Sequence, residues 1–424
     1  MQISISRFSL IVFAAYLLMG SIPRFISFNG SSLPINELLL YFYFSILFFL
    51  IPNTYIRVLK NIAPIILIIL SSYLYGLLLH GFDMKSLYYV LRTIFQIMIG
   101  ILVGYHIYDF YKDKIKNFID DYLNLYLIIS LISIVILIFF PHAYDFYKFL
   151  ENFGINFYAD PQVNRLISVY LDPNLFAMIV SLPIFFIVTE LFNRFRLRSM
   201  YLLIFFSICL FLTFSRSGIA SFLLLFFIYS LIYFIKSVFY TKRVRINSLY
   251  LIAIISVAGF IFLSGFVILS FDQIIERLSD PISQDASGLL RLESSLIGIN
   301  SILENPLFGV GYNYGYIVSE ARTLVSEHAG VQSGFDSSIL TIIVNFGLIP
   351  SIVLFFFIFR AIISVKTNSQ DLLLYWIPLK IYLFVVAIFY SQLNNILFFQ
   401  FWLIPIISLC TYMYLISINK NDFN

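Results

Sequence analysis

The feature that most constrains the fold of this chain is a series of continuous apolar runs, each about twenty residues long. A backbone surrounded by lipid must satisfy its own hydrogen bonds, so it crosses a membrane as a helix or as part of a closed β-barrel. Barrel strands alternate apolar and polar residues over about ten positions, and these runs do not alternate. Charged residues make up only 11% of the 424 positions, whereas soluble domains carry about 25%. The sequence therefore predicts an all-α, polytopic transmembrane protein with one membrane domain over residues 1–424.

A hydropathy window of about nineteen residues predicts about twelve spans. They cover approximately residues 8–23, 36–52, 62–80, 87–108, 122–141, 173–192, 199–214, 217–240, 249–271, 337–360, 372–391 and 394–417. The first run lacks a clear small-residue cleavage site and further spans follow it, so we expect an uncleaved first helix.

Basic residues give the orientation of these spans. Most of the 26 lysines and arginines fall on one side of the predicted membrane, in short loops such as 192–199 and 236–245. Because basic loops stay in the cytoplasm, both termini are predicted to be cytoplasmic. Two long loops, 142–172 and 272–336, then face the outside, and the second precedes the tenth span. We attribute the net charge of +4 to the basic residues that flank the helices, and we predict no nucleic-acid partner.

Three of the arginines that remain on the outer side stand out, since basic residues are depleted there. Arg165 precedes the segment LDPNLFAMIV, Arg216 lies in LTFSRSGIASF between two apolar runs, and Arg291 lies in the long loop. A charged side chain within or close to the hydrocarbon region of a membrane is costly and often marks a substrate path. Guanidinium groups bind phosphate oxygens through two hydrogen bonds and stay charged. These arginines suit an anionic substrate, although Arg216 could instead extend to the lipid headgroups, and Arg165 and Arg291 could be ordinary loop arginines.

The long loop carries further candidates at its end. Asp336 precedes the tenth span, where an aspartate or serine can cap a helix or a carboxylate can accept a proton from a sugar hydroxyl. His328 lies in the same loop and could act as a base or a hydrogen-bond donor, or could be structural. Gly309 and Gly311 form a GxG whose simpler interpretation is a turn and whose alternative is a phosphate cradle. The preceding apolar spacing predicts an amphipathic helix along the outer membrane surface.

Other catalytic signatures are missing from the sequence. It contains no Walker loop, HExxH, paired CxxC or GxSxG, and the acidic residues are too scattered to form a clear metal set. Cys209 and Cys410 lie inside apolar runs and are expected to be small core residues. Asp172 before Pro173 predicts a helix start, with the aspartate as the N-cap.

Four of these segments, taken in order, resemble a known family. The order R-LISVYLDPN-LFA, LTFSRSG, RLESSLIGINSILENPLFGVGYN and DSSILTIIVNFGLIP, from Arg165 to Pro350, is similar to that of the O-antigen polymerase and O-antigen ligase superfamily of bacterial membrane glycosyltransferases. The resemblance implies a protein of the bacterial cytoplasmic (inner) membrane that works on its outer leaflet. Such proteins move a glycan from an undecaprenyl-pyrophosphate carrier to an acceptor sugar. The resemblance implies no metal or cofactor, because the pyrophosphate carrier is itself the leaving group.

The resemblance also implies roles for particular residues. Arg216 and Arg291 match arginines thought to hold the pyrophosphate, and Arg165 matches a further arginine. Ligases begin the following helix with His-Asn, and here Asp336 and Ser337 take that place. This difference favours a polymerase, with Asp336 or His328 as the catalytic residue.

The expected partners are undecaprenyl-pyrophosphate-linked oligosaccharides, membrane lipids, and a chain-length regulator and flippase of the same pathway. The alternatives are a ligase-type transferase onto lipid A–core or another acceptor, and a lipid-linked oligosaccharide flippase. Flippases tend to have internal repeats and charged residues inside helices, and no repeat is evident here.

Overall fold

The computed structural model describes residues 4–22, 26–28, 31–33, 35–152, 165–193, 196–235, 286–315, 337–364, 370–391, 397 and 399–421. Its helices are α1 (Ile5–Met19), α2 (Ile35–Leu50), α3 (Pro52–His80), α4 (Met84–Tyr111), α5 (Ile115–Phe139), α6 (Ala143–Glu151), α7 (Pro173–Asn193), α8 (Leu197–Leu212), α9 (Arg216–Ile235), α12 (Ala286–Glu304), α14 (Ser338–Phe346), α15 (Leu348–Ser364), α16 (Gln370–Val385), the π-helical η2 (Val386–Tyr390) and α18 (Gln400–Asn421). Two short strands, β1 (Ile26–Phe28) and β2 (Ser31–Leu33), pair antiparallel.

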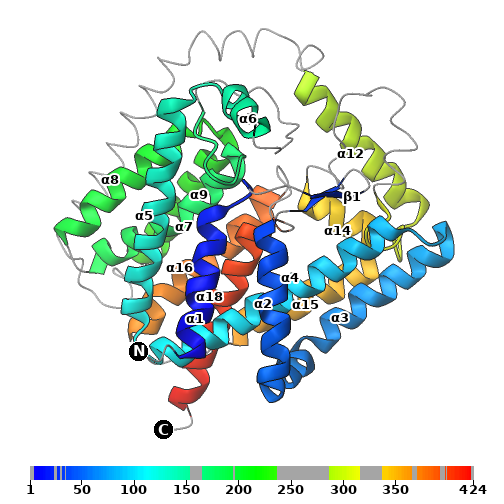
Figure 1. Ribbon diagram of the computed structural model, residues 1–424, viewed down its shortest axis with the longest axis horizontal. Helices are drawn as coiled ribbons and strands as arrows, with labels where there is room; N and C mark the ends of the chain where they lie inside the picture. The colour runs from blue at the N-terminus through cyan, green and yellow to red at the C-terminus, as the bar shows by residue number, and fades with distance from the viewer. Residues whose placement is uncertain are drawn as a thin grey trace.

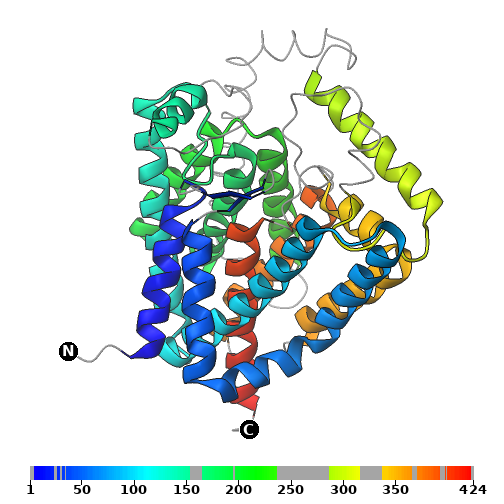
Figure 2. The same ribbon diagram turned by 45° about the vertical axis from the view of Figure 1, so that its right-hand side comes forward.

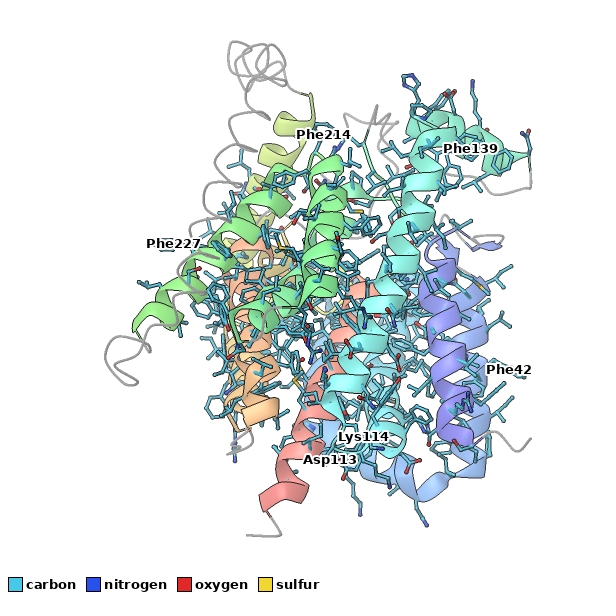
Figure 3. All side chains as sticks on the ribbon, turned by 90° about the vertical axis from the view of Figure 1, so that its left-hand side faces the viewer. Phe42, Asp113, Lys114, Phe139, Phe214 and Phe227 are labelled. Atoms are coloured by element: carbon cyan, nitrogen blue, oxygen red, sulfur yellow. The ribbon has the colours of Figure 1, made fainter. Side chains whose placement is uncertain are left out.

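The predicted helical membrane architecture is confirmed. Among the described helices, five are long and apolar enough to cross a membrane: Ile62–His80, Met84–Tyr111, Ile115–Phe139, Pro173–Asn193 and Gln400–Ile418. Several shorter apolar helices accompany them, including α1, α2, α8 and α9. Large apolar side chains such as Phe42 and Phe227 project from the periphery, as in a protein surrounded by lipid (Figure 3). The predicted span at 249–271 lies outside the described residues.

The helices form a bundle around α7. In the most apolar segment of this helix, 94% of the residues are buried. Asp172 caps this helix as the sequence predicts, because its Oδ1 accepts hydrogen bonds from the amides of Asn174 (2.7 Å) and Leu175 (3.1 Å). Helices α8, α9 and α16 pack on α7, and α4 crosses the molecule between this group and a second group formed by α3, α12, α14 and α15 (Figures 1 and 2).

The most extensive helix pair among the described elements is α4 with α18. Its close approach depends on two glycines one turn apart, as small residues allow in membrane helices. A Cβ at Gly100 would lie 2.8 Å from Cβ of Ile407, and one at Gly104 would lie 2.5 Å from Cβ of Thr411. Side chains at these two positions would push the helices apart.

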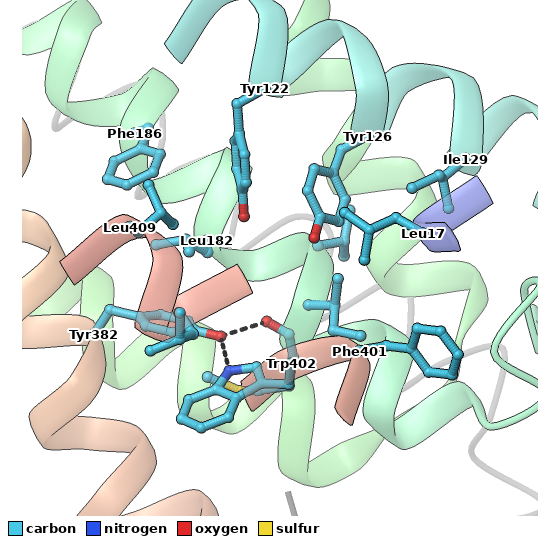
Figure 4. Close-up of a cluster of buried hydrophobic side chains, with 14 of the residues drawn as sticks. Leu17, Tyr122, Tyr126, Ile129, Leu182, Phe186, Tyr382, Phe401, Trp402 and Leu409 are labelled. Carbon is cyan, nitrogen blue, oxygen red and sulfur yellow. Dashed lines mark hydrogen bonds between the residues drawn. The ribbon is translucent and has the colours of Figure 1, made fainter. Parts of the chain in front are cut away.

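Tyrosine and tryptophan side chains occupy the middle of the main core (Figure 4). The Tyr382 hydroxyl accepts a hydrogen bond from Nε1 of Trp402 (2.8 Å) and donates one to the carbonyl of Met178 (3.0 Å). These bonds join α16, α18 and α7. They satisfy polar groups that would otherwise be costly to bury.

The predicted span at 337–360 differs from the structure, which divides it into α14 and α15 at Gly347. Gly347 has φ +74° and ψ −179°, a conformation that is essentially restricted to glycine. The Cα of Gly347 packs directly against the backbone of another loop. A Cβ at this position would lie 2.4 Å from the amide nitrogens of Phe308 and Gly309. The break exists because a remote loop packs into it, and hydropathy cannot show such a contact.

The bundle has two distinct ends. Phe214, in the α8–α9 turn, and Phe139, at the end of α5, lie at one end, and Asp113 and Lys114 lie at the other (Figure 3). The chain begins and ends at the end that holds Lys114 (Figure 1). We call the end that holds Phe214 the outer end, following the orientation predicted from the basic loops.

Candidate functional site

Arg165 joins two of the four predicted motifs. Its Nε donates a hydrogen bond to the carbonyl of Thr213 (2.9 Å), and its Nη2 donates one to Oδ1 of Asn174 (3.2 Å). A backbone bond from the amide of Leu166 to the carbonyl of Leu212 (2.8 Å) runs beside them. The segment before α7 therefore lies against the turn between α8 and α9.

That turn places Arg216 at the first residue of α9. Phe214 adopts a left-handed φ of 49°, and the Ser215 Oγ accepts a hydrogen bond from the amide of Gly218 (3.1 Å), as an N-cap does. A Cβ at Gly218 would lie 2.5 Å from Cβ of Ala177, so α9 begins in close contact with α7. The backbone position of Arg216 is thus fixed near Arg165, and the side chain of Arg216 lies outside what the structure describes.

The other two motifs form a second unit, made of α12, α14 and the loop between Asn305 and Gly315. Arg291 lies in the second turn of α12, and its side chain is outside the described part. Farther along this helix, Gly298 faces Leu340 of α14 at close range. The opposite face of α12 exposes Leu296, Ile299 and Leu303, which fits the predicted amphipathic helix.

The GxG segment, residues 309–311, forms a turn that joins the end of α12 to α14, and we call this turn the clasp. The structure therefore favours the predicted turn over a phosphate cradle. The amide of Gly309 donates to the carbonyl of Asn305 (3.0 Å), that of Val310 to Val344 (2.8 Å), and that of Gly311 to Asn345 (3.0 Å). A phosphate cradle needs free amides, and these three are already bonded to protein carbonyls. The clasp fixes α12 to α14, and therefore fixes the backbone of Arg291 relative to the start of α14.

Ser337 supplies the N-cap of α14. Its Oγ accepts from the amide of Leu340 (3.2 Å) and donates to the carbonyl of Ser391 (3.2 Å), just after η2. The neighbouring Ser338 Oγ accepts from the amide of Leu397 (3.1 Å). Since η2 packs on α9, these bonds connect the α12–α14 unit to the helix that begins at Arg216.

The structure therefore brings the backbones of the four motifs into one connected region. Of the five predicted site residues, Arg165 is described in full, and Arg216 and Arg291 are placed by their helices. Asp336 and His328 lie outside the described residues. Within the described part of the chain, no group of three or more His, Cys, Asp or Glu side chains is arranged to hold a metal ion.

A buried polar cluster was not among the predicted site residues. Glu37 of α2, Arg92 and Gln96 of α4, and Gln400 of α18 contact one another in an apolar part of the bundle. Beside them, Tyr312 donates a hydrogen bond to Oγ1 of Thr93 (2.8 Å), and burial raises the pKa of Tyr312 to about 12. A signal was present in the sequence, because Glu37 and Arg92 are opposite charges within two separate apolar runs.

These features define a class of protein: a polytopic membrane protein with an arginine-bearing region built from α7, α9, α12 and α14. Comparison with known families gives a more particular result. The family model described as O-antigen ligase matches residues 201–358, and this match supports the resemblance of the chain to the O-antigen ligase and polymerase superfamily. The match indicates glycan transfer of the ligase or polymerase type, with lipid-linked oligosaccharides as substrates. No curated protein matches the chain.

Proposed function

We propose that this protein is a polysaccharide repeat-unit polymerase of the bacterial cytoplasmic membrane. It transfers a growing glycan from undecaprenyl pyrophosphate to the non-reducing end of the next lipid-linked repeat unit, at the outer leaflet. The observation that carries the proposal is the pair of hydrogen bonds from Arg165 to Thr213 and Asn174. They bring Arg165 to the turn from which α9 and Arg216 begin.

In the proposed reaction, the pyrophosphate of the growing chain lies against Arg216 and Arg291. A sugar hydroxyl of the second lipid-linked unit attacks the anomeric carbon, and the bond between that carbon and the pyrophosphate oxygen breaks. The hydroxyl proton passes to Asp336, or to His328, and undecaprenyl pyrophosphate leaves. The arginines stabilise the charge that develops on the leaving group, an effect worth roughly 3–4 kcal/mol per well-placed donor.

The helix cap supports a chemical role for Asp336. Ser337 already accepts a hydrogen bond from the amide of Leu340 at the N-terminus of α14. The helix therefore does not require a carboxylate at position 336 for capping. We infer that Asp336 is available as the acceptor of the hydroxyl proton.

Substitution of the arginines tests the proposal. Arg216→Ala and Arg291→Ala are each expected to abolish long polymer, while single repeat units still reach the cell surface. Lys148→Ala is a matched control, since Lys148 is a basic residue of α6 outside the matched motifs. A normal ladder of chain lengths in either arginine variant would contradict the assigned roles.

Asp336→Asn and His328→Ala then separate the two candidate bases. The asparagine keeps the size of the side chain and removes the proton acceptor, so polymer should disappear if Asp336 is the base. Polymer that persists in Asp336→Asn and disappears in His328→Ala would indicate that His328 is the base.

The ligase is a second candidate, because the matching family model carries that description. Deletion of the gene distinguishes the alternatives. A polymerase deletion leaves single units on the surface, a ligase deletion leaves long polymer on its lipid carrier, and a flippase deletion leaves lipid-linked units on the inner leaflet. Glycan analysis of the deletion strain, resolved by leaflet, measures the outcome.

A further inference from the structure

Among the described residues, Arg92 forms its ion pair and hydrogen bonds through one edge of its guanidinium group, the edge that carries Nε and Nη2. Its Nε donates to Oε1 of Glu37 (2.7 Å), and its Nη2 donates to Oε2 of Glu37 (3.0 Å) and to Oε1 of Gln400 (3.0 Å). Glu37 is fully buried, while the Arg92 side chain keeps 23% of its exposure. The carboxylate thus orients the plane of the guanidinium group.

The other edge of this guanidinium group carries Nη1. No hydrogen bond joins Nη1 to any residue that the structure describes, and the ring of Tyr89 has its centroid 5.9 Å from Cζ. Arg92 lies within the apolar span Met84–Tyr111. An N–H group at membrane depth is costly without an acceptor. Because the Arg92 side chain is 23% exposed, an oxygen acceptor from outside the described residues can reach it.

Neighbours of Arg92 contact both units of the candidate site, the unit around α7 and α9 and the unit of α12 and α14. On one side, Thr93, the next residue, bonds to Tyr312 of the clasp (2.8 Å). On the other side, Gln400 precedes Phe401, whose ring centroid is 5.1 Å from that of Tyr170, in the segment that begins at Arg165. Arg92 is therefore linked through Thr93 to the clasp and through Gln400 to the segment that begins at Arg165.

We propose that Arg92 is a phosphate-binding residue, separate from Arg216 and Arg291, for a phosphate group carried by a membrane lipid. The proposal rests on the proposed function, because a polymerase holds two lipid-linked pyrophosphates at once and needs a place for the second. Glu37 and Gln400 orient the guanidinium group, and Nη1 donates its hydrogen bonds to the phosphate oxygens. The phosphate comes from the lipid-linked substrate or from a phospholipid headgroup.

Binding to the full-length protein in phosphatidylcholine nanodiscs tests this site without any transfer reaction. The probes are undecaprenyl phosphate, phosphatidylglycerol and inorganic pyrophosphate. The main variant is the double substitution Glu37→Gln/Arg92→Gln, which removes both charges together and keeps a polar side chain at each position. We expect undecaprenyl phosphate to bind at least about tenfold more weakly, the loss of one charge-assisted hydrogen bond, with an unchanged thermal unfolding temperature. Wild-type affinity for all three probes in the double variant would overturn the proposal.

The three probes distinguish the sources. Weaker binding of undecaprenyl phosphate alone indicates the lipid-linked substrate, and an equal loss for phosphatidylglycerol indicates a headgroup site. A loss for inorganic pyrophosphate as well shows that the phosphate itself is recognised.

Glu37→Gln alone separates phosphate binding from a structural ion pair. This variant keeps the cation and removes a competing anion, so phosphate should bind at least as tightly as in the wild type. If it does not fold, Arg92→Lys replaces it, since that variant also keeps a cation. Binding lost in the cation-keeping variant to the same extent as in the double variant shows that the pair only joins helices. Wild-type binding by all these variants would leave the proposed transferase function intact, because that function is tested at Arg216 and Arg291.

Discussion

Arg165 has a structural role in the fold, and we propose a chemical role for it as well. Its bonds to Thr213 and Asn174 require the fork geometry of a guanidinium group, which an ammonium group cannot reproduce. We predict that Arg165→Lys lowers the free energy of unfolding by about 1.5–3 kcal/mol, the usual contribution of hydrogen bonds from a charged group. Polymer synthesis should fall with it. Thermal unfolding in detergent and the surface glycan ladder measure the two effects.

Asn174→Ala is the matched comparison for Arg165→Lys. It removes one acceptor and leaves the arginine and its bond to Thr213 in place. If Arg165 only joins the segments, stability and synthesis should decline together in both variants. A loss of synthesis in Arg165→Lys that exceeds its loss of stability, with Asn174→Ala close to wild type, indicates contact with the substrate.

Some single positions were predictable and others were not. The cap at Asp172 followed from local sequence, because capping involves neighbours only two or three residues away. The Arg92–Glu37 pair joins positions 55 residues apart on different helices. Nothing local in the sequence specifies that contact, so the sequence could indicate two unusual charges without showing that they are partners.

At the scale of elements, the clasp between α12 and α14 is the feature that most affects the site. Gly347 and Gly81 have nearly the same backbone conformation, φ 74° and ψ −179° against φ 83° and ψ −178°. Gly347 faces backbone at 2.4 Å, whereas nothing lies within 4 Å of a Cβ at Gly81. Gly81→Ala therefore reports backbone strain alone, and Gly347→Ala reports strain together with the lost clasp.

We predict that Gly81→Ala destabilises the protein by roughly 1–3 kcal/mol and leaves polymer synthesis measurable. Gly347→Ala should be more destabilising and should abolish synthesis, since α12 and α14 would separate. Chemical unfolding in mixed micelles and the glycan ladder provide the comparison. Equal effects of the two substitutions would show that the clasp has no role beyond its backbone conformation.

Hydropathy located most helices because lipid exposure requires long apolar runs, which are visible in sequence. It joined α14 to α15, since a break that depends on a loop far away in the chain leaves the apolar run intact. The same limit applies to η2 at the end of α16. Its contact with α9 connects the two halves of the site, and no local pattern predicts it.

At the scale of the whole molecule, motifs dispersed over nearly two hundred residues (165–350) form two units, which the bond from Ser337 to Ser391 and the contact of η2 with α9 connect. The family match covers 201–358, so the segment that carries Arg165 and the helices that carry Glu37 and Arg92 lie before it. Hydrogen bonds and packing join these earlier segments to the matched part. The region that resembles the family is therefore positioned in part by segments that precede it.

The orientation of the molecule in its membrane can be tested with two introduced cysteines. Cys209 and Cys410 are first replaced by alanine, and one cysteine is then placed at Lys114 or at Glu151, both exposed and at opposite ends of the bundle. Lys114 lies in a basic turn that the charge distribution assigns to the cytoplasm, and Glu151 ends α6, in the predicted outer loop. A membrane-impermeant maleimide should label Glu151→Cys in intact spheroplasts and label Lys114→Cys only after permeabilisation. The reverse pattern would place the arginine region in the cytoplasm, where an undecaprenyl-pyrophosphate-linked chain at the outer leaflet cannot reach it.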